Sequence, residues 1–153
     1  MALSIQKDLP SLIQFPETYL IVLTGLGAIS LSGEEQSKYL QGQVTCDVLE
    51  SNENSLTHGA HCNAKGKVFS TFRLINRLSE HLLLQEKSSL EASLAELKKF
   101  GVFAKVTIKT LNTLSFYAIV GENAKKTLQD NYKKVPDSLT PVIHINSTTL
   151  VYI

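Results

Sequence analysis

Two lysines flank a glycine in the segment His61–Ser70, at a point where the chain should reverse direction. Asn63 suits the first position of a type I turn, and Gly66 suits the last, where the backbone needs a positive φ. Lys65 and Lys67 would then lie at the tip of a hairpin, where two ammonium groups attract an anion. The alternative is an ordinary solvated basic turn, because surface turns are usually polar.

Three residues in this region, His58, His61 and Cys62, are types that bind metals or act in catalysis. His61 and Cys62 are neighbours in an expected strand, so their side chains should point to opposite faces, and no second pair of ligands accompanies them. A thiol nucleophile also needs a base and an orienting group, and the sequence places neither. We therefore expect no metal site and no catalytic residue, and we expect Cys46 and Cys62 to be structural.

Asp47 is the remaining candidate for polar chemistry. It follows a predicted helix in a dense polar run with Gln41, Gln43 and Thr45, in a connection that should touch the core. One interpretation is a ligand-binding carboxylate. The alternative is a loop residue that caps local backbone N–H groups. The sequence shows no phosphate loop, dinucleotide fingerprint or Ser-His-Asp pattern.

The composition indicates a globular chain of 153 residues, with 43% hydrophobic and 19% charged residues. A formal net charge of +1 argues against direct nucleic-acid binding, which usually needs a strongly basic surface. No apolar run is long enough to cross a bilayer, and the N-terminus lacks the features of a secretory signal. Two cysteines do not make a disulfide framework. We therefore expect a cytoplasmic protein without a membrane partner.

The hydrophobic pattern predicts an α+β protein with a mainly antiparallel sheet and helices packed on it. Ser32 with Glu35, and Ser88 with Glu91, have the spacing of capping boxes and predict the starts of two helices, which end near residues 41 and 101. A third helix is expected at 122–133. Strands are expected at 19–23, 28–32, 56–62, 67–78, 81–85, 105–109, 115–121, 142–146 and 148–153.

The predicted elements fall into three regions: an N-terminal arm at 1–18, a first α+β subdomain at 19–110, and the start of a second at 111–153. The last residues, Leu150–Ile153, are an apolar strand without a terminal loop, which we interpret as a truncated subdomain. An unpaired strand edge exposes a row of N–H and C=O groups. We therefore expect self-association, most simply as a homodimer through the C-terminal region.

Three segments, Lys38–Val48, Ala60–Lys67 and Leu97–Ile108, resemble the YgfZ family and occur in the family's order. The resemblance covers nearly the whole chain from about Leu20. YgfZ proteins are folate-binding relatives of the aminomethyltransferase (T-protein) of the glycine cleavage system. The family's reactive-cysteine motif, Lys-Gly-Cys-Tyr-x-Gly-Gln-Glu, lies in a later part of the family's chain, so this sequence looks like roughly the first half.

The resemblance implies a T-protein-like folate-binding domain and a role in tRNA modification through iron–sulfur enzymes. Leu26 occupies the place where some members carry a tryptophan and would line the slot for the pteridine ring. Asp47 would bond the amide and amine edge of that ring, and Lys65 or Lys67 would pair with the tail carboxylates.

The predicted function is therefore a tetrahydrofolate-binding accessory protein that supports the assembly or repair of iron–sulfur enzymes of tRNA modification. Two alternatives stay open. One is a folate-dependent aminomethyltransferase, which would need an acid or base near the reactive nitrogens of the folate. The other is a plain protein-interaction module.

Overall fold

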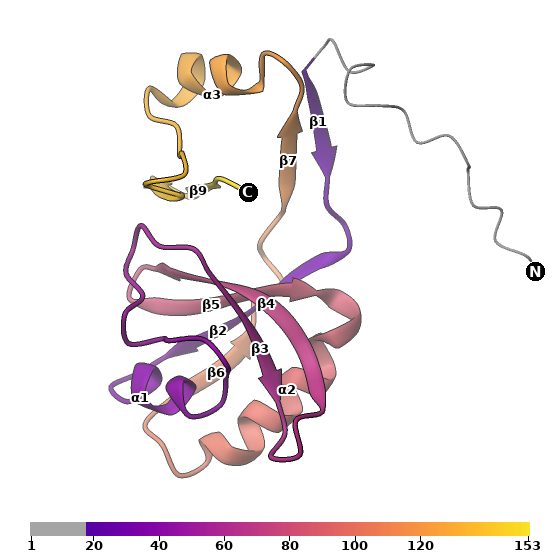
Figure 1. The fold of residues 1–153 in the computed structure, drawn as a ribbon, viewed down its shortest axis with the longest axis vertical. Coiled ribbons are helices and arrows are strands. Elements are labelled where there is room, and N and C mark those ends of the chain that lie inside the picture. Colours follow the sequence, from indigo (N-terminus) through magenta and orange to yellow (C-terminus); the bar gives the residue numbers. More distant parts are fainter. Residues whose placement is uncertain (1–17) are drawn as a thin grey trace, which may run out of the picture. The chain divides into compact units, whose positions relative to one another are not determined.

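The computed structural model describes residues 18–153, so the predicted arm lies almost wholly outside the described residues (Figure 1). Two compact units can be distinguished within them. One contains strand β1 and residues 117–135, and the other contains residues 23–116 and 136–153. The elements in order are β1 (Tyr19–Val22), β2 (Leu26–Ser32), α1 (Gln36–Gln41), β3 (Thr57–Cys62), β4 (Val68–Arg77), β5 (Glu80–Glu86), α2 (Lys87–Gly101), β6 (Thr107–Thr110), β7 (Tyr117–Val120), α3 (Ala124–Tyr132), β8 (Val142–Ile145) and β9 (Thr148–Val151).

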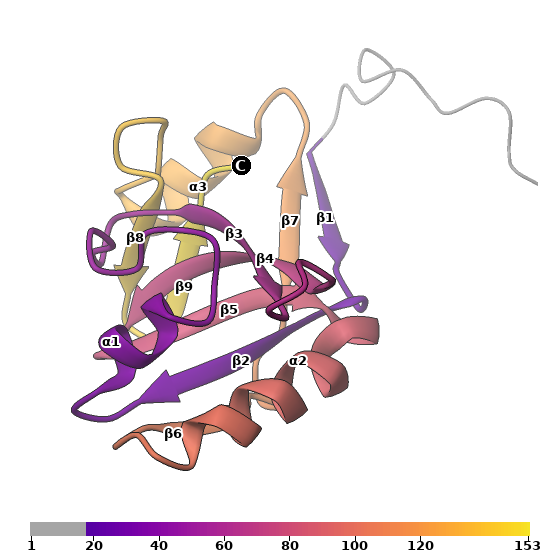
Figure 2. The ribbon, with the colours of Figure 1, turned by 60° about the horizontal axis from the view of Figure 1, so that its bottom comes forward.

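The larger unit is built on a five-stranded antiparallel sheet with the order β3-β4-β5-β2-β6. Its register places Ile29 of β2 opposite Leu83 of β5, and Leu83 opposite Leu74 of β4. Helix α2 runs along one face of this sheet (Figure 2) and contacts four of its strands. The predicted α+β class with a mainly antiparallel sheet is confirmed.

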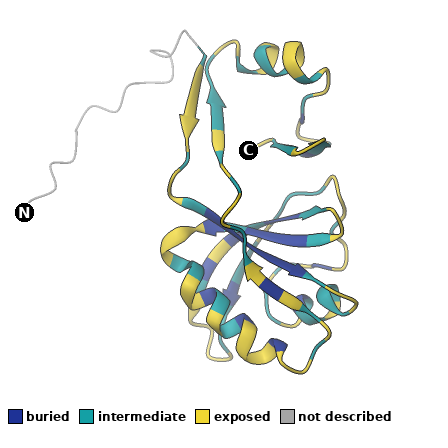
Figure 3. Ribbon diagram, turned by 180° about the vertical axis from the view of Figure 1, so that it is seen from behind, coloured by how far each residue is buried: buried dark blue, intermediate teal, exposed yellow. Residues whose placement is uncertain are grey.

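The main core lies between the sheet and the two helices α1 and α2. Alternate residues of each strand point into it, as the period of two in a strand requires. Figure 3 shows the buried positions concentrated in the sheet, with exposed positions along the outer side of α2. Three leucines line the inner side of α2: Leu97 is fully buried, and Leu90 and Leu94 pack against the core. Each fully buried leucine of this kind contributes roughly 1.5–3 kcal/mol.

The opposite face of the sheet is covered in part by the hairpin of β8 and β9. Val142 is fully buried and packs with Ile75 and Leu82, and Val151 lies beside them. Asn54 holds the hairpin by accepting a hydrogen bond from the amide of Val142 (3.2 Å) and donating one to its carbonyl oxygen (3.0 Å). Residues 142–151 therefore pack on the sheet formed by earlier residues. The predicted subdomain boundary at 110/111 and the predicted homodimer stay predictions.

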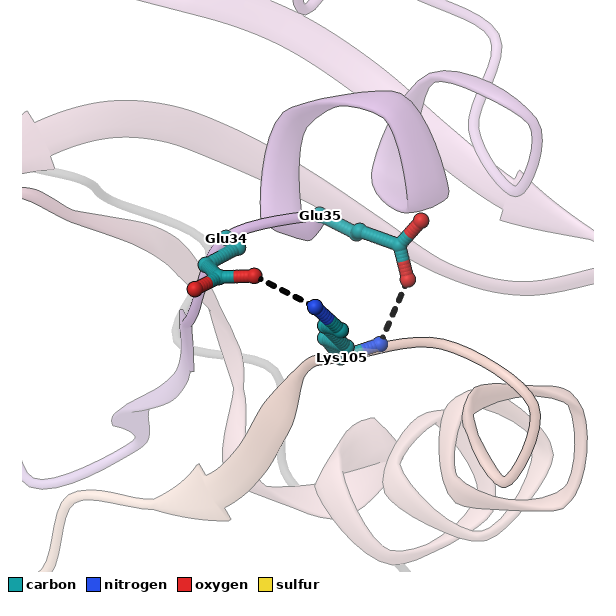
Figure 4. Close-up of polar contacts among 3 residues, drawn as sticks. All are labelled: Glu34, Glu35 and Lys105. Atoms are coloured by element: carbon teal, nitrogen blue, oxygen red, sulfur yellow. Dashed lines mark hydrogen bonds and ion pairs between the residues drawn. The ribbon is translucent and has the colours of Figure 1, made fainter.

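The predicted capping box at the start of α1 is wrong. Neither Ser32 nor any other side chain caps this helix, and Glu35 is bonded elsewhere. The Glu35 carboxylate accepts a hydrogen bond from the backbone amide of Lys105 at 2.7 Å, and the Glu34 carboxylate pairs with the Lys105 ammonium group at 2.8 Å (Figure 4). Gly33, at φ +128°, brings the chain so close that a Cβ atom would collide with the Lys105 carbonyl oxygen.

The second predicted capping box, Ser88 with Glu91, is also wrong. Strand β5 continues to Glu86, and α2 begins at the next residue, so Ser88 lies inside the first helical turn. Helix α2 has no side-chain cap, and the hydroxyl of Ser89 instead donates back to the carbonyl oxygen of Glu86 at 2.8 Å. The spacing suits a cap, but the helix begins one residue before Ser88, so Ser88 and Glu91 are both inside α2.

The smaller unit is an antiparallel pair of β1 and β7 followed by helix α3. Tyr19 lies opposite Val120, and Val22 lies opposite Tyr117. The sequence predicted both strands but not that they pair with each other across almost a hundred residues. No helix among residues 18–153 is both long and apolar enough to cross a membrane.

Candidate functional site

The β3–β4 hairpin has the turn that the sequence predicts. The amide of Gly66 donates to the Asn63 carbonyl oxygen at 2.9 Å, and Gly66 adopts φ +79°. The Asn63 side-chain oxygen accepts from the amides of Lys65 and Lys67, both at 2.9 Å. Both lysines are exposed at the tip of the hairpin. The geometry thus offers two ammonium groups to an anion, and their ligand stays a prediction.

Leu26 begins strand β2 and lines a cavity of about 220 Å³. Its apolar walls include Leu90 at the start of α2 and Phe116 before β7, and its polar groups come from Lys87 and Asn112. Leu26 therefore lies in the wall of a cavity that has both apolar and polar lining groups. Its contact with a folate stays a prediction.

Leu26 and the lysine hairpin lie at the same end of the sheet. Gly27 of β2 and Phe72 of β4 are both opposite Gln85 of β5, which runs between them. Because β5 is antiparallel to both neighbours, β2 and β4 run in the same direction and begin at the same end of the sheet. Leu26, the predicted apolar part of the site, and Lys65 and Lys67, the predicted cationic part, are therefore at the same end of the sheet.

Asp47 lies apart from this end. Val44 bridges to His61, and the Thr45 amide donates to the Ala60 carbonyl oxygen at 3.0 Å, so this segment runs along β3 away from the hairpin tip. The Asp47 carboxylate accepts hydrogen bonds from the backbone amides of Leu49 (3.1 Å) and Glu50 (3.4 Å). Asp47 thus has the capping role that the sequence left open as the alternative. Its contact with folate stays a prediction.

His61 is sealed in the core beneath α2. Only 2% of it is exposed, and its Nδ1 atom lies 2.9 Å from the hydroxyl of Ser93, which also accepts a hydrogen bond from Ser70 at 3.3 Å. Burial lowers the pKa of His61, and the Glu96 carboxylate partly offsets this effect. Within residues 18–153, no three His, Cys, Asp or Glu side chains gather where they could hold a metal.

The two cysteines are free thiols, each partly buried. Cys46 packs against Gly59, and a Cβ atom on that glycine would approach the sulfur to 2.7 Å. Burial raises the pKa of the Cys46 thiol, which lowers its content of reactive thiolate at neutral pH. This agrees with the structural role that the sequence predicts for Cys46.

A second cavity, of about 370 Å³, contains a group of residues that the sequence did not indicate. His81 lies in its wall, with Nε2 at 2.8 Å from the hydroxyl of Ser37 and Nδ1 at 2.6 Å from the side-chain oxygen of Asn76. Ser37 belongs to α1, Asn76 to β4 and His81 to β5. No spacing rule connects them, because only the packing of α1 beside the β4–β5 hairpin brings them together.

Comparison with known proteins shows relatives along the whole chain, although no family model matches. The chain is 64% identical over all 153 residues to the tRNA-modifying protein YgfZ of Colwellia psychrerythraea (strain 34H), of which it covers 47%. It is 40% identical over 147 residues, or 96% of its length, to the protein of the same name from Hamiltonella defensa, of which it covers 43%. The chain spans about half the length of the curated relatives it matches.

The fold has a solved counterpart. The glycine cleavage system aminomethyltransferase T of Bartonella henselae matches 74% of this chain and 31% of its own with a TM-score of 0.67. The sequence identity is 17%, so this likeness shows the T-protein fold alone. The identities to the curated relatives are much higher and run through all three segments in which the resemblance was seen. The chain belongs to the family of the tRNA-modifying protein YgfZ.

Proposed function

We propose that this chain is part of a folate-binding accessory protein that acts in tRNA modification. The observation that carries the proposal is the 64% identity, over the full chain, to a relative named for tRNA modification. In this proposal the protein supports iron–sulfur enzymes that modify tRNA, through ligand capture and partner contact. A cytoplasmic location, which suits a chain with two free thiols, belongs to the same proposal.

The cavity beside Leu26 supports the folate part of the proposal. At about 220 Å³ it is smaller than a typical ligand pocket of roughly 300–1,000 Å³, so it would hold the pteridine ring and leave the tail outside. Leu26, Leu90 and Phe116 would contact the faces of the ring, and the Asn112 amide has both a donor and an acceptor for its polar edge.

The tail carboxylates would meet lysines. Lys87 lines the cavity itself, while Lys65 and Lys67 are exposed at the same end of the sheet. A charge-assisted hydrogen bond is worth more than a neutral one, so one lysine would noticeably raise the affinity. Aminomethyl transfer would need an acid or base near the reactive nitrogens of the folate. The polar side chains that line this cavity are those of Lys87 and Asn112, and neither is a carboxylate. This lining favours folate binding over aminomethyl transfer.

The test is a calorimetric titration of tetrahydrofolate into the purified chain. Lys65→Ala/Lys67→Ala and Lys87→Ala should each weaken binding by roughly 1–3 kcal/mol if the altered lysines hold the tail. The matched control is Lys125→Ala/Lys126→Ala on α3, which removes the same charge from the smaller unit and should leave affinity unchanged.

Two results would contradict the proposal in different ways. Wild-type protein that fails to bind tetrahydrofolate at millimolar concentration would overturn the folate site on this chain. Binding that is equally strong in all the lysine variants would overturn only the assignment of the tail contacts. For the role in tRNA modification, the full-length gene carrying Leu26→Asp should fail to restore modified nucleosides in a deletion strain if that role depends on folate.

A further inference from the structure

The cavity of about 370 Å³ lies between α1, the loop at 48–53 and the turn between β4 and β5. Ser37, Asn76 and His81 all line it, so each is within reach of a small molecule that enters. This cavity is separate from the one beside Leu26, with which it shares no lining residue. A function of this cavity is therefore independent of the proposed folate site.

The donor and acceptor of each hydrogen bond in the wall of this cavity can be assigned in turn, starting from Ser51. The hydroxyl of Ser51 donates to the Val48 carbonyl oxygen at 2.6 Å, so its own oxygen is left to accept from the Asn76 side-chain nitrogen at 3.1 Å. Asn76 therefore presents its oxygen to His81, where it accepts from Nδ1 at 2.6 Å. With the proton on Nδ1, the Nε2 atom carries a lone pair and accepts the hydroxyl proton of Ser37 at 2.8 Å.

The surroundings keep the His81 ring neutral. It is 5% exposed, and burial lowers its pKa, so at neutral pH its Nε2 atom is free to take a proton. The surroundings contain two acidic residues. Glu53 lines the same cavity as His81. The Glu80 carboxylate accepts a hydrogen bond from Ser30 and lies near Lys109, on the other face of the sheet. A hydroxyl bonded to a neutral imidazole whose other nitrogen is held by an acceptor is the arrangement of an activated nucleophile.

The turn at the rim of the cavity is strained. Leu78 and Ser79 adopt φ +51° and +63°, a left-handed conformation that costs side chains other than glycine about 1 kcal/mol or more each. The side-chain nitrogen of Gln36 holds this turn by donating to the Ser79 carbonyl oxygen at 2.8 Å. Positive φ at both residues of a two-residue loop is the geometry of a tight β-hairpin turn, and this turn connects the strands that carry Asn76 and His81.

We propose that Ser37 is a nucleophile toward carboxylic esters or thioesters, with His81 as its general base and Asn76 as the residue that positions His81. The Ser37 oxygen forms a bond to the acyl carbon as its proton passes to His81 Nε2. The bond from that carbon to the leaving oxygen or sulfur then breaks, and the leaving group takes the proton from His81. Water hydrolyses the acyl-serine by the same sequence of proton transfers.

The test uses an alkyl fluorophosphonate probe on the purified chain, with the labelled peptide identified by mass spectrometry. The Ser37 oxygen should form a bond to phosphorus, fluoride should leave with its electron pair, and the hydroxyl proton should pass through His81 to solvent. We expect a single labelled residue, Ser37, and a labelling rate that falls as the pH drops below the His81 pKa. Ser37→Ala should abolish labelling.

Two further variants separate catalysis from structure. His81→Gln keeps a hydrogen-bond acceptor for Ser37 but no base, so labelling should slow by about 100-fold or more while the melting temperature shows that the fold persists. Asn76→Asp places a carboxylate beside Nδ1 and favours the charged imidazole, so the decline of labelling should begin at a higher pH. A purely structural Asn76 would not move this profile.

The matched control is Ser93→Ala, which removes the serine bonded to the other buried histidine, His61. It should leave the labelling of Ser37 unchanged in the folded fraction. Folded wild-type protein that is not labelled, that is labelled at other serines at the same rate, or that is labelled equally fast in His81→Gln would overturn the proposal.

Discussion

Two histidines of the larger unit make nearly the same contact in different surroundings. His61 on β3 and His81 on β5 each share a hydrogen bond with a serine, at 2.9 and 2.8 Å respectively. The partner of His61, Ser93, belongs to the 15-residue helix α2 and is fully buried. The partner of His81, Ser37, belongs to the six-residue helix α1 and lines a cavity.

The comparison shows that a histidine–serine contact does not by itself indicate chemistry. Both imidazoles are desolvated, and burial lowers the pKa of each. Both rings are buried, and what separates them is that His81 borders a cavity whereas Ser93 and α2 close over His61. The long helix α2 covers His61 completely, whereas the short helix α1 leaves space between itself, the loop at 48–53 and the β4–β5 turn. The first contact lies inside the core, and the second borders a cavity.

The largest expected effect comes from removing the sealed histidine. His61→Ala should lower the free energy of unfolding by roughly 2–4 kcal/mol, because it opens a cavity in the core and leaves Ser93 without its ring partner. His81→Ala should lower it by less, because water in the adjacent cavity can fill the space. Urea denaturation of the two variants measures the difference, and equal losses would show that the two sites are equally closed.

Removing the hydroxyl group of each serine partner should also lower the free energy of unfolding by different amounts, and by less than removing the histidines. Ser93→Ala leaves Nδ1 of a buried imidazole without a partner, which should cost roughly 1–3 kcal/mol of unfolding free energy. Ser37→Ala should cost less than about 1 kcal/mol, because a cavity water can bond to His81 Nε2 in place of the hydroxyl. Urea denaturation measures both losses. A larger loss of unfolding free energy for Ser37→Ala than for Ser93→Ala would contradict the prediction that the His81 site is the more open of the two.

Acid should destabilise the fold through both histidines. Their pKa values in the folded protein lie below the ordinary value of 6.5, chiefly because of burial, so the unfolded chain binds protons that the folded chain does not. Their contribution to stability is therefore complete above pH 6.5 and is lost as the pH falls toward the folded pKa values, with a slope of at most about 1.4 kcal/mol per pH unit for each histidine. Denaturation midpoints between pH 7 and 5 should fall, and less steeply in His61→Gln/His81→Gln.

The smallest effect on stability, and the sharpest test of which histidine titrates, comes from Asn76→Asp. A carboxylate in place of the amide oxygen, 2.6 Å from Nδ1, should raise the pKa of His81 and leave that of His61 unchanged. Nuclear magnetic resonance of the imidazole protons during a pH titration resolves the two rings. A change in the pKa of both rings, or of neither, would show that the two sites are not electrically separate.

Local features were predictable from the sequence because they depend on a few adjacent residues. The turn at Asn63 and Gly66 follows from side-chain bonding and backbone freedom, and both appear as predicted. The two predicted capping boxes are wrong, and the first shows that a local spacing does not exclude a competing partner from a distant part of the chain. Glu35 had the right spacing for a cap, but Lys105, 70 residues later, offers its backbone amide to the same carboxylate.

The folate contacts of Leu26, Asp47, Lys65 and Lys67 stay predictions, and the structure adds only where these residues lie. The strand register places Leu26 and the paired lysines at one end of the sheet. Asp47 accepts hydrogen bonds from the amides of Leu49 and Glu50. Spacing along the chain could not give these positions, because they depend on the pairing of distant strands and on the direction in which the segment with Asp47 runs beside β3.

By itself the sequence determined the α+β class and the turn chemistry of the β3–β4 hairpin, because side-chain period and turn preference act over a few residues. Only the tertiary structure decided that β1 pairs with β7, that His61 is sealed, and that His81 meets Ser37 and Asn76 at a cavity. These are contacts between segments far apart in the chain. Their formation depends on how helices of unequal length pack on the sheet, and this packing cannot be predicted from the pattern of a few adjacent residues.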